Sequence, residues 1–144
     1  MRPACEKDLG PMIEFDGVFF KEIVEQGLRE FPNECCGVIA ANGDGRAVKI
    51  FPMKNADASP VTYRLDGMEQ LKLFDQMDEQ GWGLWAIYHS HTHSEAYPSD
   101  TDRRLAFYPD ARYMVLSLAD RDEPVLRSSF ICDGEVTEEE LTIV

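Results

Sequence analysis

The chain has 144 residues, 44% of them hydrophobic, so it is long enough to bury one core, and no linker-like tract or repeat divides it. Its formal net charge of −13 argues against nucleic-acid binding, which needs clustered lysine and arginine. No apolar run approaches the roughly 18 residues of a membrane span, and the first residues lack the apolar segment of a signal peptide. We therefore expect a single domain over residues 1–144, located in the cytoplasm, with no nucleic-acid or membrane partner; the oligomeric state stays open.

Hydrophobic periodicity and turn residues predict an α/β fold, in which a central mixed sheet is flanked by helices. The expected elements, in chain order, are a strand at 13–15, a helix over 20–31, strands at 36–41 and 47–51, a helix from Asp66, a strand at 84–88, a helix from Ser99 through Phe107, a strand at 113–118, and a hairpin of 125–132 and 135–144. The helix from Asp66 is expected to turn four apolar side chains toward the core, Met68, Leu71, Phe74 and Met77.

Four cysteines occur in the chain, Cys5, Cys35, Cys36 and Cys132, with neither a CxxC pair nor regular disulfide spacing. This usage predicts reduced thiols in a reducing compartment. Cys35 and Cys36 are neighbours at an expected strand, so their side chains should point to opposite faces and cannot easily share one metal ion. Buried small side chains are the favoured interpretation for both.

The pattern H-x-H-x7-S-x2-D starts at His89 and indicates a metal site. His89 and His91 are two residues apart at the end of an apolar strand, so both side chains should point the same way. Ser99 is expected to be a helix N-cap, which puts Asp102 in the first helical turn. Three nitrogen or oxygen ligands leave the fourth position of zinc open to water, as in catalytic rather than structural sites. The pattern predicts one catalytic zinc ion per chain.

Each of these residues also has a purely structural explanation that needs no metal ion. Histidines at a strand end are often surface residues, and Ser99 with Asp102 also fits a capping box. His93 lies outside the pattern and is interpreted as a loop histidine. The joint spacing of all four pattern residues favours the metal site over these separate explanations.

Glu34 is the candidate general base that a water-activating zinc site needs. It lies between the expected first helix and the buried strand that begins at Cys36, where a carboxylate has no packing role. The alternative is a solvated glutamate in the turn marked by Pro32 and Asn33.

Together, Glu34, His89-Ser90-His91, Ser99 and Asp102 resemble the JAMM, or MPN-type, metallopeptidases. The resemblance covers about residues 12–141 and implies one JAMM/MPN domain with a cytidine-deaminase-like fold. It also implies that the two histidines and Asp102 hold zinc, that Glu34 is the general base, and that Ser99 helps to stabilise the oxyanion. Members of the family cut peptide or isopeptide bonds at the C-terminus of ubiquitin-like proteins.

Four longer phrases are similar to one bacterial branch of the family, the Mec-type CysO-cysteine peptidases: residues 63–66, 89–92, 95–99 and 133–139. This similarity implies release of cysteine from the Gly-Gly-Cys tail of a ubiquitin-like sulfur carrier, a step of cysteine biosynthesis. Two alternatives stay open. One is hydrolysis of other ubiquitin-like isopeptides or of small-molecule amides. The other is a non-catalytic MPN scaffold, although no expected metal ligand is missing.

Tyr63 and Arg64 are the candidate substrate-binding residues. We expect the segment 59–64 to form one wall of the site as an exposed strand edge, because Pro60 cannot donate to a ladder. Tyr63 would offer a stacking ring, and Arg64 a partner for a terminal carboxylate. The alternative places Tyr63 in the core and Arg64 in solvent.

Overall fold

The computed structural model describes residues 12–144. The elements are β1 (Ile13–Phe15), α1 (Gly17–Glu30), β2 (Cys36–Ala41), β3 (Ala47–Met53), α2 (Gly67–Glu79), β4 (Gly83–His91), α3 (Asp100–Arg104), β5 (Arg112–Ser117), β6 (Val125–Cys132), β7 (Glu135–Glu139) and β8 (Leu141–Ile143). Six strands form one sheet in the order β3-β2-β4-β5-β6-β7, and β1 pairs with β8 in a separate two-stranded sheet. The expected α/β class is confirmed.

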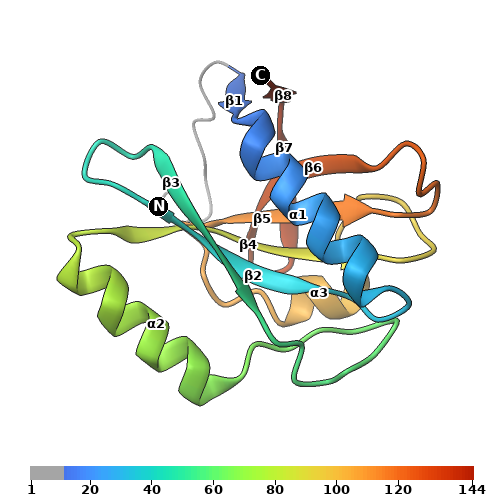
Figure 1. The fold of residues 1–144 in the computed structure, drawn as a ribbon, viewed down its shortest axis with the longest axis horizontal. Helices are drawn as coiled ribbons and strands as arrows, with labels where there is room; N and C mark the ends of the chain where they lie inside the picture. The colour runs from blue at the N-terminus through green and yellow to red at the C-terminus, as the bar shows by residue number, and fades with distance from the viewer. Residues whose placement is uncertain (1–11) are drawn as a thin grey trace.

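The large sheet is mixed: β4 runs parallel to β5, and all other neighbouring strands of this sheet are antiparallel. Figure 1 shows α1 crossing one face of this sheet, whereas α2 and α3 lie on its other side. Alternate residues of the central strands feed the two cores: Ile39 and Tyr88 pack on the α1 side, and Val38 and Ile87 on the α2 side. β2 is buried along its whole length, as its apolar sequence predicts.

Gly37 is required where β2 meets β4. A Cβ atom at this position would lie 2.2 Å from the hydroxyl oxygen of Tyr88. That hydroxyl donates to Gln26 Oε1 at 2.5 Å, and Gln26 Nε2 donates to the Cys36 carbonyl at 2.9 Å. The close approach therefore seats a buried polar link between α1 and the start of β2, immediately after Glu34.

The expected core face of α2 is wrong for two of its four residues. Met68 and Leu71 are 65% and 57% exposed, whereas Leu73 and Met77 are buried. At 3.6 residues per turn, Met68 lies roughly half a turn around the helix from Leu73 and Met77, so one narrow face cannot bury all of them. The helix start at Asp66 is confirmed, since its carboxylate accepts from the Met68 and Glu69 backbone N–H groups.

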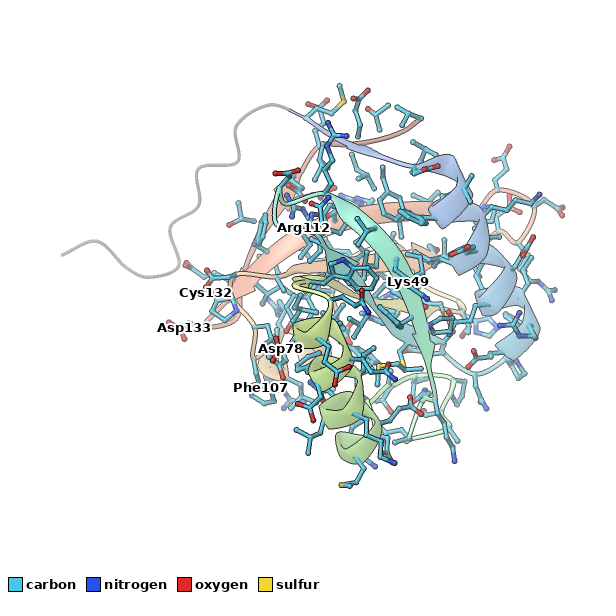
Figure 2. The ribbon with its side chains drawn as sticks, turned by 60° about the vertical axis from the view of Figure 1, so that its left-hand side comes forward. Lys49, Asp78, Phe107, Arg112, Cys132 and Asp133 are labelled. Atoms are coloured by element: carbon cyan, nitrogen blue, oxygen red, sulfur yellow. The ribbon has the colours of Figure 1, made fainter. Side chains whose placement is uncertain are left out.

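Two expected boundaries are also wrong. α3 ends at Arg104: the Leu105 N–H makes the last helical bond, to the Thr101 carbonyl, and Leu105 itself leaves helical geometry with φ −103° and ψ 13°. Phe107 lies beyond the helix and is largely exposed (Figure 2). The last expected strand is divided into β7 and β8. After Glu139 the chain leaves the large sheet, and Leu141 pairs in parallel with Ile13.

The expectation of reduced thiols holds for Cys35 and Cys36, which are free and buried and belong to the cores on opposite faces of the sheet. It is wrong for Cys132, which is disulfide-bonded at the half-buried end of β6 (Figure 2). Cys5 lies outside the described residues. No helix within residues 12–144 is long and apolar enough to cross a membrane.

Candidate metal centre and active site

The side chains of His89, His91 and Asp102 meet at one point. His89 Nε2 and His91 Nε2 are 3.2 Å apart, and each lies 3.0 Å from Asp102 Oδ2. Both histidines end β4, and residues 87, 89 and 91 share one face of the strand, which explains why the two rings point the same way. Ligand atoms about 2.0–2.1 Å from a tetrahedral zinc ion are roughly 3.3 Å apart, so this donor set fits zinc.

The hydrogen bonds around the cluster leave the correct nitrogen free for a metal ion. His91 Nδ1 lies 2.8 Å from the Glu95 carbonyl, which can only accept, so Nδ1 carries the proton and Nε2 has a lone pair. His89 is fully buried, and its ring stacks on Tyr63 with centroids 4.2 Å apart. Both histidine rings are thus fixed by contacts within the protein, which contradicts the alternative that they are surface residues.

The electrostatics of the cluster also favour a cation. Burial lowers the pKa of His89, although the Asp102 carboxylate opposes this. Burial alone would raise the pKa of Asp102, but the short contacts of its carboxylate with both histidine rings and the charge of His89 hold it well below its usual range. Burial opposes protonation of His91, yet its bonds to Asp102 and to the Glu95 carbonyl raise its pKa overall. An ionised carboxylate and a neutral histidine are the forms that bind metal, so Asp102 and His89 are in the required state, whereas His91 must release any proton on Nε2 when the ion binds.

Ser99 and Asp102 form the capping box of α3. The Asp102 N–H donates to Ser99 Oγ at 3.1 Å, and the Ser99 N–H donates to Asp102 Oδ2 at 2.9 Å. The same carboxylate oxygen therefore caps the helix and faces the two histidines. The capping-box and the metal-site explanations of Ser99 and Asp102 are therefore both correct, because the cap fixes the direction in which Asp102 faces the histidines.

Glu34 lies just before β2, opposite the end of β4, since Cys36 pairs with His89 across the two strands. Its side chain is only 3% exposed, and Oε1 has no hydrogen-bond partner among the described residues. Burial raises its pKa to about 8, and of the nearby charges that of His91 lowers the value and that of Asp102 raises it. A solvated turn glutamate, the alternative explanation, is contradicted by this burial.

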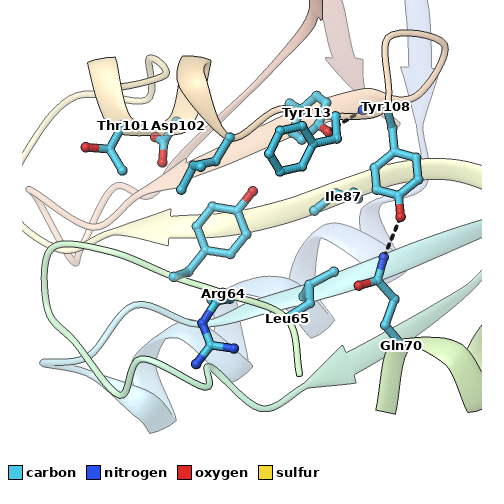
Figure 3. Close-up of a pocket in the computed structure, with 11 residues that line it drawn as sticks. Arg64, Leu65, Gln70, Ile87, Thr101, Asp102, Tyr108 and Tyr113 are labelled. Atoms are coloured by element: carbon cyan, nitrogen blue, oxygen red, sulfur yellow. Dashed lines mark hydrogen bonds between the residues drawn. The ribbon is translucent and has the colours of Figure 1, made fainter. Parts of the chain in front are cut away.

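A cavity of about 220 Å³ adjoins the cluster, and Asp102 itself lines it (Figure 3). Ile87 and Tyr113 of the sheet lie on one side, with Leu105 beyond α3 and Arg64 in the facing loop. Ile87 precedes His89 by two residues on the same face of β4. This part of the cavity therefore lies about 7 Å along the strand from His89. Figure 3 shows Gln70 and Tyr108 on the side of the cavity away from Asp102, where Gln70 Nε2 donates to the Tyr108 hydroxyl at 2.7 Å.

Tyr63 and Arg64 both line this cavity, in a loop rather than at a sheet edge. Only an isolated bridge between Asn55 and Leu65 occurs in this part of the chain, so the expected strand edge at 59–64 is wrong. Tyr63 packs on His89, and Arg64 is exposed, with its Nε bonded to Asp57 Oδ1 at 3.1 Å. The packing of Tyr63 against the core and the exposure of Arg64 agree with the alternative explanation of this pair, so their contact with substrate stays a prediction.

A family model, described as prokaryotic homologs of the JAB domain, matches residues 18–131. The chain belongs to this family. The CysO-cysteine peptidase of Mycobacterium tuberculosis is 46% identical over 123 residues, which are 85% of this chain and 84% of that protein. The desampylase of Haloferax volcanii is 38% identical over 88 residues, or 60% of this chain and 63% of that protein. A Desulfitobacterium hafniense protein known from a solution structure has a TM-score of 0.82 at 34% identity, covering 92% of this chain and 93% of its own.

The JAMM/MPN resemblance of the sequence is confirmed by these matches. Two residues that support the site in the structure were not among the site residues predicted from the sequence motif, Asn55 and Thr92. Asn55 bonds to the Glu34 carbonyl, and the Thr92 hydroxyl donates to the Pro60 carbonyl at 3.2 Å. His93 is a loop residue, as expected, and lies beside the Phe31 ring. Of these supporting residues, only Thr92 could have been found from the sequence, because it directly follows the HxH motif.

Proposed function

We propose that the chain is a cytoplasmic zinc peptidase that cleaves the C-terminal peptide or isopeptide bond of a ubiquitin-like sulfur carrier, releasing cysteine from a Gly-Gly-Cys tail. One observation carries the peptidase proposal: His89, His91 and Asp102 converge at the end of β4, and Glu34, a buried carboxylate with an unpartnered oxygen, lies just before the facing end of β2. The match to a CysO-cysteine peptidase over most of both chains supports the substrate. All three ligand side chains are present, which argues against a metal-free scaffold.

We assign the metal to His89 Nε2, His91 Nε2 and Asp102 Oδ2, with one zinc ion per chain. When bound, zinc supplies a Lewis acid for the scissile carbonyl and lowers the pKa of a water ligand to about 7. Glu34 accepts the water proton and hands it to the leaving amine. Its buried position suits the second of these steps, because a raised pKa keeps the accepted proton on the carboxyl group until the amine leaves, while the charge of a bound zinc ion would favour the carboxylate that the first step needs.

We assign Ser99 as a donor to the oxyanion that forms at the scissile carbonyl. Its Oγ accepts from the Asp102 N–H, so the hydroxyl proton stays available for donation. Ser99 is exposed, so substrate can reach it, and the cap fixes the direction of its side chain.

We assign the cavity beside Asp102 to the residue released from the carrier. Arg64 would bind its terminal carboxylate: the bond to Asp57 uses only Nε, and both terminal Nη groups are without a partner among the described residues. Tyr63 would form the wall between this residue and the metal ligands. A small-molecule amide lacks the extended tail that such a carrier supplies.

Arg64→Ala should raise KM about 10- to 100-fold for a substrate ending in a free-carboxylate cysteine, and much less for the C-terminal amide. The reason is the loss of one charge-assisted hydrogen bond, roughly 1.5–3 kcal/mol, which only the carboxylate makes. Steady-state kinetics on both substrates measures the effect. Arg46→Ala, in the exposed turn between β2 and β3, is the matched control and should leave both KM values unchanged. Equal changes on acid and amide would exclude carboxylate binding by Arg64.

The activity is tested by incubating the zinc-loaded protein with a sulfur carrier that ends in Gly-Gly-Cys and recording its intact mass. We expect loss of one cysteine residue. A second candidate, isopeptide cleavage, is favoured by the match to a desampylase. A carrier joined through Gly-Gly to a lysine of another protein, incubated in parallel, decides between them. Faster cleavage of this conjugate would reassign the substrate, and cleavage of neither would refute the peptidase proposal.

A further inference from the structure

Asn55 lies just beyond β3 and is 5% exposed. Its carboxamide uses every hydrogen bond that it can make. Nδ2 donates to the Glu34 carbonyl at 3.1 Å and to the Thr62 carbonyl at 2.9 Å. Oδ1 accepts from the backbone N–H groups of Asp57 and Arg64 at 3.0 and 3.1 Å. One buried side chain thus joins the backbone of the candidate base to the loop that lines the cavity.

The loop holds Glu34 from a second side. The Glu34 N–H donates to the Ser59 carbonyl at 2.8 Å, so both the amide and the carbonyl of Glu34 are bonded to the segment 55–64. Thr92, directly after β4, ties the same segment to the histidine strand through the Pro60 carbonyl. Segment 55–64 therefore bridges the start of β2 and the end of β4, the two strand ends that carry the site.

The same segment presents the two candidate substrate residues. Tyr63 stacks on His89, and Arg64 reaches the cavity. The Glu34 carboxylate, by contrast, has an oxygen with no partner among the described residues, so its place depends on how its backbone is held. We infer that Asn55 is a positioning residue that aligns Glu34 with the cavity wall. The inference rests on the proposed function, since it assigns Asn55 a part in that reaction without contact with the reacting atoms.

Asn55→Asp is the sharpest test because it changes only half of the contacts. The aspartate keeps the oxygen that accepts from Asp57 and Arg64, and loses the donor to Glu34 and Thr62. Asn42→Asp is a matched control: Asn42 Oδ1 accepts from two backbone N–H groups, of Asp44 and Arg46, in the turn between β2 and β3. Asn55→Ser, which is uncharged, serves if Asn55→Asp does not fold, and it also controls for the added charge.

The kinetic readout uses zinc-loaded protein, with rates expressed per folded molecule. We expect Asn55→Asp and Asn55→Ser to lower kcat 10- to 100-fold and to raise KM, since a misplacement of about 1 Å can cost on the order of 10²-fold. Zinc content should not change, because no ligand side chain comes from segment 55–64. Asn42→Asp should leave kcat and KM at wild-type values. A purely structural Asn55 would reduce the folded fraction and leave kcat and KM of the folded molecules unchanged, which would overturn the inference.

Amide hydrogen exchange gives a readout that needs no activity. We expect the Glu34 N–H to exchange at least tenfold faster in both Asn55 variants and at the wild-type rate in Asn42→Asp, because the bond to Ser59 depends on a held loop. Unchanged exchange at Glu34 would also overturn the inference. If wild-type protein cleaves no carrier, the proposed function fails, while the exchange experiment still decides whether Asn55 holds Glu34.

Discussion

Glu34→Gln should lower turnover of the carrier by roughly 10²- to 10⁴-fold, the usual contribution of a positioned general acid or base. Glutamine has almost the same shape but cannot accept the proton of water. The variant should retain its zinc and its fold, since Glu34 is not among the three clustered ligands. Single-turnover kinetics with metal analysis of the same sample measures both quantities.

The control for this prediction is Glu30→Gln at the end of α1, four residues earlier in the chain. It changes the same type of side chain outside the cluster and should keep wild-type turnover. Near-normal hydrolysis by Glu34→Gln would remove Glu34 from the mechanism. A variant that loses zinc as well as activity would instead mark Glu34 as a contributor to metal binding.

The same substitution should alter the pH dependence of stability in the metal-free protein. Burial raises the pKa of Glu34 from 4.5 to about 8, so the folded state binds its proton more tightly than the unfolded state does. The stabilisation that this proton gives is complete below pH 4.5 and is lost as the pH rises to 8. Glutamine has no proton to lose. The difference in denaturation midpoint between Glu34→Gln and wild type should therefore grow from pH 4.5 to 8 in favour of the variant; a constant difference would contradict the raised pKa.

The position of the metal cluster could be predicted from the sequence because local rules determine it. Strand alternation aims His89 and His91 the same way, and an N-cap at Ser99 places Asp102 in the first turn of a helix. The structure brings these side chains within 3.2 Å of one another. Glu34 could be proposed from its position between a helix and a buried strand and from the family resemblance, but no local rule brings it to the cluster, since 55 residues separate it from His89 and the pairing of β2 with β4 closes that gap.

Contacts between segments far apart in the chain could not be predicted from the sequence, because local patterns do not show which segments pack together. Asn55 has no periodic neighbours that mark it, and its partners include Glu34, 21 residues earlier. The split of the last strand depends on the pairing of β8 with β1 at the other end of the chain. The expected core face of α2 used a spacing of three residues, which drifts about half a turn around the helix from Met68 to Met77, so packing could bury only one end of that set. Short-range patterns define elements, whereas the packing of elements decides which side chains they share.

Replacing both histidines, in a His89→Ala, His91→Ala variant, should abolish zinc retention. Two of three protein ligands are lost, and the remaining carboxylate of Asp102 already has a second role as the cap of α3. The loss should exceed the roughly 10- to 100-fold that removal of a supporting partner costs. Asp102→Asn should weaken retention less than the double replacement, because the amide oxygen can still cap the helix while the charge is gone. Metal analysis after dialysis should find about one zinc per wild-type chain.

His93→Ala is the matched control for the histidine pair. His93 follows His91 by two residues, yet its ring lies beside Phe31, 5.7 Å between centroids, and its Nδ1 meets the Thr92 hydroxyl at 2.9 Å. Its removal should leave zinc content and turnover unchanged, because alternation along β4 stops at His91 and the chain turns away. Full zinc occupancy in the double variant would show that the metal binds elsewhere. Loss of zinc in His93→Ala would extend the site beyond the H-x-H pair.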